Sequence, residues 1–217
     1  MTLRQVRPSV LLWDWDNTLV DAWGGVTAAL NAAFAAFAMP SWTEDETRAR
    51  ARVSLRDSFP QMFGTEWLRA RDVFYATLGE RHLDHVQPMP GVIAALERGR
   101  PWPQGVVSNK TGRYLRAEVA HLGWAPLFRA VVGAGDAEAD KPDPRPLLLA
   151  LMKIGAVADA TVWYVGDTAL DMQAARAAGL TAVLVGDAAH DGGIETAAPD
   201  LHFRDAHDLA SRLAQLA

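Results

Sequence analysis

Short apolar runs alternate with longer amphipathic stretches over most of the chain. The first run, residues 9–15, is apolar on both sides, as in a strand at the middle of a parallel sheet. Further strands are predicted over residues 105–107, 130–133, 161–165, 181–185 and 201–203. The stretches between and after them predict helices over residues 111–122, 146–154, 170–178 and 206–216. This alternation is typical of an α/β fold with a doubly wound parallel sheet.

One long segment, residues 20–87, departs from this alternation because it shows only helical patterns. Helices are predicted there over residues 22–39, 43–52, 57–63 and 66–83. At the start of the second helix, Thr43 and Glu46 have the spacing of a capping box. We therefore expect an α/β core made of residues 1–19 and 88–217, and a helical insertion made of residues 20–87.

Length and composition agree with one domain that carries an insertion, and they exclude several classes of function. The chain has 217 residues, enough for one domain with a substantial insertion, and its 50% hydrophobic content supplies a core. The formal net charge of −5 argues against binding to nucleic acid, which depends on clustered cations. The absence of cysteine excludes disulfides, a thiol nucleophile and zinc sites built on thiolates.

No targeting or membrane segment stands out near the start of the sequence. The apolar run of residues 10–13 is followed by Asp14 and Asp16, and it is far too short for a signal sequence or a membrane span. We expect a cytoplasmic protein that does not bind membranes. The sequence leaves its oligomeric state open.

Polar side chains follow the predicted strands, at the ends where ligands bind in open parallel sheets. They comprise carboxylates, hydroxyls, an amide and a lysine: Asp14, Asp16, Thr18, Ser108, Asn109, Lys141, Asp167 and Asp171. Carboxylates at one edge repel one another unless a cation balances them, and Mg²⁺ prefers such oxygen ligands. The remaining groups are the donors that a phosphoryl group needs. The set indicates Mg²⁺-dependent phosphoryl chemistry, whereas Lys110 and Lys153 are expected on the surface.

Four segments resemble, in order, the motifs of the haloacid dehalogenase-like hydrolases, in particular the phosphoglycolate phosphatase-like members with an α-helical cap. The segment Asp14-Trp15-Asp16-Asn17-Thr18 resembles their first motif, DxDx[TV]. The other three are Ser108-Asn109-Lys110, Lys141-Pro142-Asp143-Pro144 and Gly166-Asp167-Thr168-Ala169-Leu170-Asp171. One such motif is weak evidence, but four in the expected order at the expected strand ends are specific.

The resemblance implies catalytic roles for three residues. Asp14 matches the nucleophile that forms an aspartyl phosphate. Asp16 matches the general acid that protonates the leaving oxygen and then, as a base, activates water. Lys141 matches the cation that holds the nucleophile and the transferring phosphoryl group together.

The resemblance also implies binding roles. Thr18, Ser108 and Asn109 match residues that bind the phosphate. The implied Mg²⁺ ligands are Asp14, Asp167 and the main-chain carbonyl of Asp16, and Asp171 is implied to act nearby through a metal-bound water.

The helical insertion resembles the family's α-helical cap, which closes over the site and contacts the leaving group. Residues 52–59 look like the substrate-specificity loop of phosphoglycolate phosphatase-like relatives. Trp23, Arg52 and Arg56 are therefore candidates for substrate binding. The alternative is a solvated face in which Arg48, Arg52 and Arg56 pair with Glu44 and Asp45.

Together these features predict a Mg²⁺-dependent phosphatase acting on a small phosphorylated metabolite, with the exact ester left open. A phosphomutase of the β-phosphoglucomutase type shares every core motif and stays an alternative, although residues 20–87 lack the lysine that would help hold a second phosphate. A non-enzymatic phospho-accepting signalling domain is a further alternative. Such a domain has no acid/base residue two positions after its phosphorylated aspartate, whereas this chain has Asp16 there.

Overall fold

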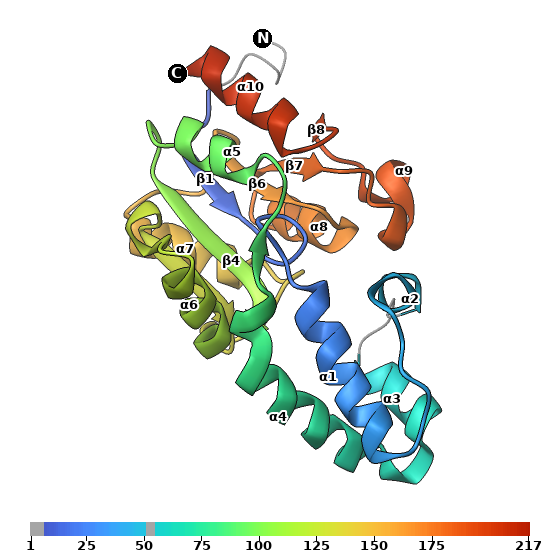
Figure 1. Ribbon diagram of the computed structural model, residues 1–217. Helices are drawn as coiled ribbons and strands as arrows, with labels where there is room; N and C mark the ends of the chain where they lie inside the picture. The colour runs from blue at the N-terminus through green and yellow to red at the C-terminus, as the bar shows by residue number, and fades with distance from the viewer. Residues whose placement is uncertain (1–6, 51–54) are drawn as a thin grey trace. The chain divides into compact units, whose positions relative to one another are not determined.

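A computed structural model of the chain describes residues 7–50 and 55–217, except for the side chains of residues 55–57. The chain forms two compact units, coloured along the sequence in Figure 1. An α/β unit comprises Met1–Val20 and Pro88–Ala217, and a helical unit comprises Asp21–Gln87. The short strands β2 (Val20–Asp21) and β3 (Gln87–Pro88) pair with each other where the chain passes between the units.

The α/β unit is built on a six-stranded parallel sheet, which confirms the predicted fold class. The strand order is β5-β4-β1-β6-β7-β8. Their bounds are Val10–Trp13 (β1), Gln104–Thr111 (β4), Ala130–Ala134 (β5), Val162–Gly166 (β6), Thr181–Val185 (β7) and Leu201–Phe203 (β8). Strand β1 is central and pairs on one side with β4 and on the other with β6. All four of its residues are buried, as its two-sided apolar pattern predicts.

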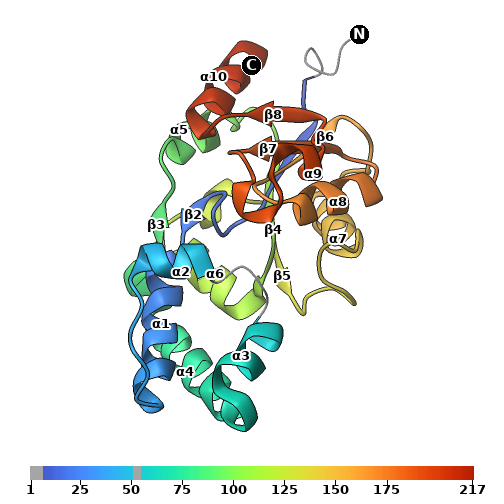
Figure 2. The same ribbon diagram turned by 90° about the vertical axis from the view of Figure 1, so that its right-hand side faces the viewer.

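Helices cover both faces of this sheet, as Figure 2 shows. One face carries α5 (Val92–Arg98), α6 (Gly112–His121) and α10 (Ala206–Leu216). The other carries α7 (Arg145–Ile154), α8 (Ala169–Ala177) and α9 (Gly193–Ala197). Helices α7 and α8 share an apolar cluster with sheet residues such as Leu12, Val107 and Leu184. The sequence patterns predict no helix at α5, whose seven residues lie between Gly91 and Gly99.

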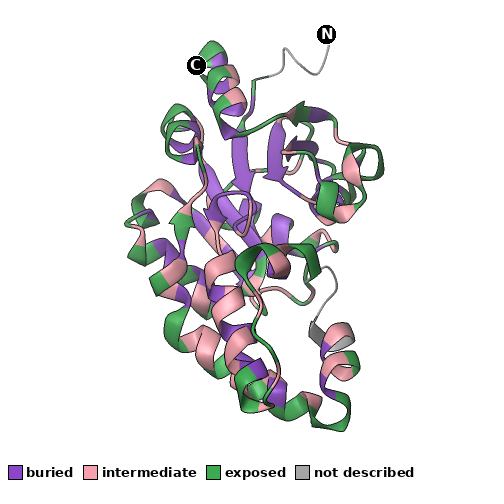
Figure 3. Ribbon diagram, turned by 45° about the vertical axis from the view of Figure 1, so that its right-hand side comes forward, coloured by how far each residue is buried: buried purple, intermediate pink, exposed green. Residues whose placement is uncertain are grey.

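The helical unit contains α1 (Trp23–Ala36), α2 (Glu44–Arg50), α3 (Leu55–Phe63), a 3₁₀ turn at Gly64–Glu66 and α4 (Trp67–His85). Its core is rich in aromatic side chains, among them Phe34, Phe59 and Phe74, and Figure 3 shows buried positions on the helices that carry them. The predicted capping box is confirmed. The Thr43 amide donates to Glu46 Oε2 at 2.9 Å, and the Glu46 amide donates to Thr43 Oγ1 at 3.2 Å.

The described part of the chain contains no helix with the length and apolar character needed to cross a bilayer.

Candidate active site

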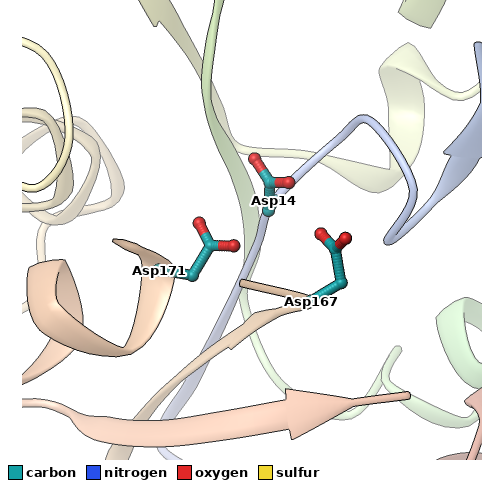
Figure 4. A group of neighbouring side chains, drawn as sticks. All are labelled: Asp14, Asp167 and Asp171. Carbon is teal, nitrogen blue, oxygen red and sulfur yellow. The ribbon is translucent and has the colours of Figure 1, made fainter. Parts of the chain in front are cut away.

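Three buried carboxylates meet at one edge of the central sheet (Figure 4). Asp14 directly follows β1, Asp167 directly follows β6, and Asp171 lies in the first turn of α8. Each offers an oxygen that lies within 4.8 Å of the others. They converge because β1 and β6 are parallel neighbours, so the residues after their carboxyl ends lie side by side.

The local sequence between Gly166 and Asp171 explains how the third carboxylate reaches the group. The Asp171 amide donates to Thr168 Oγ1 at 3.2 Å, and Asp171 Oδ2 accepts from the Thr168 amide at the same distance, so the two residues cap α8 reciprocally. Gly166 leaves room for this turn, because a Cβ there would lie 2.5 Å from Cβ of Asp171. The segment therefore aims Asp171 back toward the sheet.

Lys141 brings a positive charge into the group. It lies in the turn before α7, and its Nζ donates to Asp14 Oδ1 at 2.6 Å, to Asp171 Oδ1 at 2.7 Å and to the Tyr164 hydroxyl at 2.8 Å. Because an ammonium has three N–H donors, Lys141 is fully satisfied by these partners. Its side chain is 3% exposed, so the lysine serves this group rather than solvent.

Tyr164 is a member of the site that the sequence analysis missed. Its hydroxyl accepts from Lys141, and two acceptors lie within reach of its own proton, the Val107 carbonyl at 2.9 Å and Asp171 Oδ1 at 3.1 Å. Burial, followed by repulsion from Asp171 and Asp14, raises the pKa of Tyr164 well above its usual value, so the hydroxyl keeps its proton. The available signal was a tyrosine inside a fully apolar strand, since a buried hydroxyl needs a polar partner.

The electrostatics of the group favour a further cation. Burial raises the pKa of Asp14 to about 7, with Lys141 opposing this and Asp171 and Asp16 adding to it. Burial and repulsion from Asp14 and Asp171 also raise the pKa of Asp167 well above its usual value. For Asp171, burial raises the pKa, but Lys141 and Thr168 outweigh it and lower the pKa overall. Asp14 and Asp167 are thus the two carboxylates whose negative charge is incompletely balanced.

The oxygens left over fit Mg²⁺. Asp167 Oδ2 is buried and receives no hydrogen bond, and Nε2 of His190 lies 3.4 Å away, close enough for an ion pair but without hydrogen-bond geometry. Asp171, in contrast, uses both oxygens on Lys141 and Thr168. Asp14 and Asp167 therefore offer the oxygen-only, negatively charged donor set that a hard divalent ion prefers.

Asp16, the second aspartate of the first motif, lies outside the three-carboxylate group. Its Oδ1 accepts from Nζ of Lys110 at 2.8 Å. Lys110 is largely buried, with 12% of its side chain exposed, so the prediction that it lies on the surface is wrong. The motif in which it occurs ends β4, and the tertiary fold turns its side chain inward toward Asp16.

The structure places the three predicted phosphate-binding residues at this edge, each with a contact of its own. Thr18 donates its hydroxyl to Asp167 Oδ1 at 2.9 Å. Ser108 Oγ accepts from the Lys110 amide at 3.1 Å. Asn109 exchanges two 2.9 Å hydrogen bonds with the main chain of Lys141. Its amide therefore fixes the turn that carries the lysine, a contact that the sequence did not indicate.

The candidate substrate-binding residues belong to the helical unit. Trp23 begins α1, and the guanidinium of Arg48 lies 5.6 Å from its ring centroid. Arg48 also pairs with Asp21 and Glu44, which agrees with the solvated alternative for this one arginine. Arg52 lies outside the described residues, and Arg56 lies in α3 with its side chain not described.

Comparisons with a family model, with curated proteins and with solved structures all point to the same protein family. The family model described as haloacid dehalogenase-like hydrolase matches residues 11–185. The chain is 30% identical to N-acetylmuramic acid 6-phosphate phosphatase of Pseudomonas aeruginosa, over 82% of this chain and 81% of that protein. It is 28% identical to phosphoglycolate phosphatase of Escherichia coli, over 93% and 90% of the two chains.

A solved structure of similar fold is a haloacid dehalogenase-like family hydrolase from Streptococcus pneumoniae. It superposes with a TM-score of 0.82 and 20% identity, covering 100% of both chains. At this identity the likeness establishes the fold alone.

Proposed function

The chain belongs to the haloacid dehalogenase-like hydrolases, as its motifs predict, and from that premise we propose that it is a Mg²⁺-dependent phosphatase. Its substrate is a small phosphomonoester, and its reaction passes through an aspartyl phosphate on Asp14. The observation that carries the proposal is the buried group in which Asp14 contacts Lys141 and shares an oxygen cluster with Asp167 and Asp171. Transfer of a phosphoryl group to a carboxylate needs such a nucleophile with positive charge beside it.

In the first step, a carboxylate oxygen of Asp14 forms a bond to phosphorus while the bond from phosphorus to the ester oxygen breaks. Asp16 gives its proton to the departing oxygen, so the product leaves as a neutral alcohol. Lys141 balances the negative charge of the nucleophile and the phosphoryl oxygens. Burial opposes the charge of Lys141, but Asp14 and Asp171 hold its pKa above the ordinary value, so it stays an ammonium.

In the second step, Asp16 accepts a proton from water as the water oxygen attacks phosphorus and the bond from phosphorus to Asp14 breaks. Inorganic phosphate leaves, and the carboxylate of Asp14 and the proton on Asp16 are both restored. Asp14 and Asp167 would hold Mg²⁺, which would supply positive charge that keeps these carboxylates ionised and offsets charge on the phosphoryl oxygens. Ser108 is proposed to donate its hydroxyl to the phosphate, and Thr18 to do the same by turning its hydroxyl from Asp167 Oδ1 to a phosphoryl oxygen.

The substrate class is proposed from the relatives and from the helical unit. The two relatives named above are phosphatases of a phosphosugar and of phosphoglycolate, both small anionic esters. We propose that the predicted insertion of residues 20–87, which corresponds to the helical unit, acts as a cap that covers the reacting groups and contacts the leaving part of the substrate. Trp23, Arg52 and Arg56 are its proposed contacts. Such covering excludes water and strengthens the electrostatic interactions of the site.

The proposal is tested by release of inorganic phosphate from a panel of small phosphomonoesters, with Mg²⁺ and with a chelator. We expect Mg²⁺-dependent release by the wild type and none by Asp14→Asn. Asp72→Asn is the matched control, because the side chain of Asp72 is 69% exposed and pairs only with the neighbouring Arg71 among described residues. Equal activity of the wild type and Asp14→Asn would show that Asp14 is not the nucleophile.

Two other outcomes would point to the alternative functions. Turnover that appears only when a sugar bisphosphate is added indicates a mutase. Stable labelling of Asp14 by acetyl phosphate, without release of phosphate from any ester, indicates a phospho-accepting signalling domain.

A further inference from the structure

A buried ion pair between Lys110 and Glu118 lies next to Asp16. Lys110, at the end of β4, donates from Nζ to both oxygens of Glu118, Oε1 at 2.8 Å and Oε2 at 2.6 Å. Glu118 lies on α6 and its side chain is 1% exposed. The same ammonium donates to Asp16 Oδ1 at 2.8 Å. One buried carboxylate thus anchors the cation that contacts Asp16.

A second contact ties this ion pair to the loop after β1. The indole N–H of Trp15 donates to Glu118 Oε2 at 2.6 Å, and the Trp15 ring is fully buried with an edge contact to Trp124 at 5.8 Å between centroids. Trp15 lies between Asp14 and Asp16. Glu118 therefore fixes the backbone position of this loop through Trp15 and the side-chain position of Asp16 through Lys110.

The charge balance shows why Lys110 remains in place. Burial opposes its charge, but attraction from Asp16 and Glu118, with hydrogen bonds to both, raises its pKa. Glu118 is the more deeply buried of these two partners, and it holds the ammonium through both of its carboxylate oxygens. A polar group held before the reaction begins costs no reorganisation during it.

The contact with Lys110 also makes the two carboxylate oxygens of Asp16 different in their hydrogen bonding. Oδ1 is held by Lys110, whereas Oδ2 has no hydrogen-bond partner among residues 7–50 and 55–217 as described. We propose that Lys110, anchored by Glu118 and Trp15, is a positioning residue that presents Oδ2 of Asp16 for proton transfer to the leaving oxygen. This inference rests on the proposed function, because it concerns the acid/base role of Asp16.

The test compares phenyl phosphate with p-nitrophenyl phosphate in the wild type and in Lys110→Met. The two esters are similar in shape, but the phenolate leaving group is much more basic and needs a proton more. We measure kcat/KM, which reports the steps through release of the alcohol. For Lys110→Met we expect a loss of about 10- to 100-fold with phenyl phosphate and less than about 3-fold with p-nitrophenyl phosphate.

Stability is controlled with a second variant, because Lys110→Met removes the ammonium that balances the charge of the buried Glu118 carboxylate. That variant is expected to lower the Tm by roughly 10 °C. Lys110→Met/Glu118→Gln removes both charges and retains an acceptor for Trp15, so most of the Tm is expected to return while the selective loss with phenyl phosphate persists. Lys153→Met, at an exposed lysine of α7, is expected to match the wild type.

The outcomes separate this inference from the proposed function. Equal losses with both esters in the double variant, or no loss with either, would overturn the positioning role while the phosphatase remains. If the wild type hydrolyses neither ester and no other phosphomonoester, the proposed function itself fails.

Discussion

Tyr164→Phe removes a single oxygen atom from the group around Lys141. The hydroxyl accepts from Nζ of Lys141 at 2.8 Å, and its proton lies within reach of the Val107 carbonyl at 2.9 Å and of Asp171 Oδ1 at 3.1 Å. The phenyl ring is retained, including its contact with the ammonium, whose Nζ lies 5.4 Å from the ring centroid. The substitution therefore isolates the hydrogen bonds of the hydroxyl.

The magnitude follows from what remains after the hydroxyl is lost. Lys141 keeps Asp14 and Asp171 as partners, so one of its three N–H donors loses its acceptor at a side chain that is only 3% exposed. A hydrogen bond to a charged group contributes about 1.5–3 kcal/mol, and an unpaired buried donor costs a similar amount. We expect the free energy of unfolding to fall by about 2 kcal/mol, which lowers the Tm by roughly 4–8 °C.

The assay is urea denaturation with matched m-values, together with kcat for the best ester of the panel. Since two of the three contacts of Lys141 persist, we expect kcat to fall about 3- to 10-fold rather than to vanish. Tyr75→Phe makes the same chemical change at a residue that is 44% exposed, and its effect should stay within about 0.5 kcal/mol. A loss below about 0.5 kcal/mol for Tyr164→Phe, with unchanged kcat, would refute the reasoning about the buried ammonium.

Three further predictions concern the carboxylates, the glycine before them and the helical unit. With a chelator present, the free energy of unfolding should fall as the pH rises from about 4 to 7. The pKa of Asp14 is raised from 3.8 to about 7 in the folded state, so over this range the folded protein keeps a proton that the unfolded chain releases. Mg²⁺ replaces that proton, so thermal melts should show a larger Mg²⁺-induced rise in Tm at pH 8 than at pH 5, and an equal rise would contradict the assignment. Gly166→Ala places a Cβ 2.5 Å from Cβ of Asp171, so we expect the free energy of unfolding to fall by about 1–3 kcal/mol and kcat to fall at least about 10-fold. An unchanged kcat would show that activity does not require Asp171 to lie this close to Gly166. Phe34→Ala should cost about 3–5 kcal/mol, since the side chain is 1% exposed in the core of the helical unit. Hydrogen exchange should then rise in residues 23–85 and not in the sheet, whereas a uniform rise would mean that the two units unfold together.

The fold was predictable because its main signals are local. A strand such as β1 reads as buried on both faces, and the capping box at Thr43 is visible in four consecutive residues. The elements that were not predicted correctly lie where the local sequence pattern is weak. Helix α5 has only two turns between glycines, and β4 continues through polar residues to Thr111 because Thr111 still pairs with Ala134 after an irregularity in the ladder.

The site was predictable only in part, for a related reason. The carboxylates and Lys141 follow strands in recognisable motifs, and the topology of a parallel sheet brings strand ends together. Lys110 belongs to the second motif, but nothing in that motif indicates its partners, and Glu118 lies in none of the four motifs. Trp15, which donates to Glu118, lies 103 residues away in the sequence. A glutamate in an amphipathic helix is predicted to be exposed unless its tertiary neighbour is known.

The most direct test of the central claim is a rapid-quench reaction of Asp16→Asn with p-nitrophenyl phosphate and Mg²⁺. The good leaving group lets Asp14 be phosphorylated without an acid, while hydrolysis of the intermediate lacks its base. We predict a burst of about one equivalent of nitrophenolate followed by little turnover, with the phosphoryl group found on the peptide that contains Asp14. Steady release without a burst, or a phosphoryl group on any other residue, would contradict the assignment of Asp14 as nucleophile and Asp16 as acid and base.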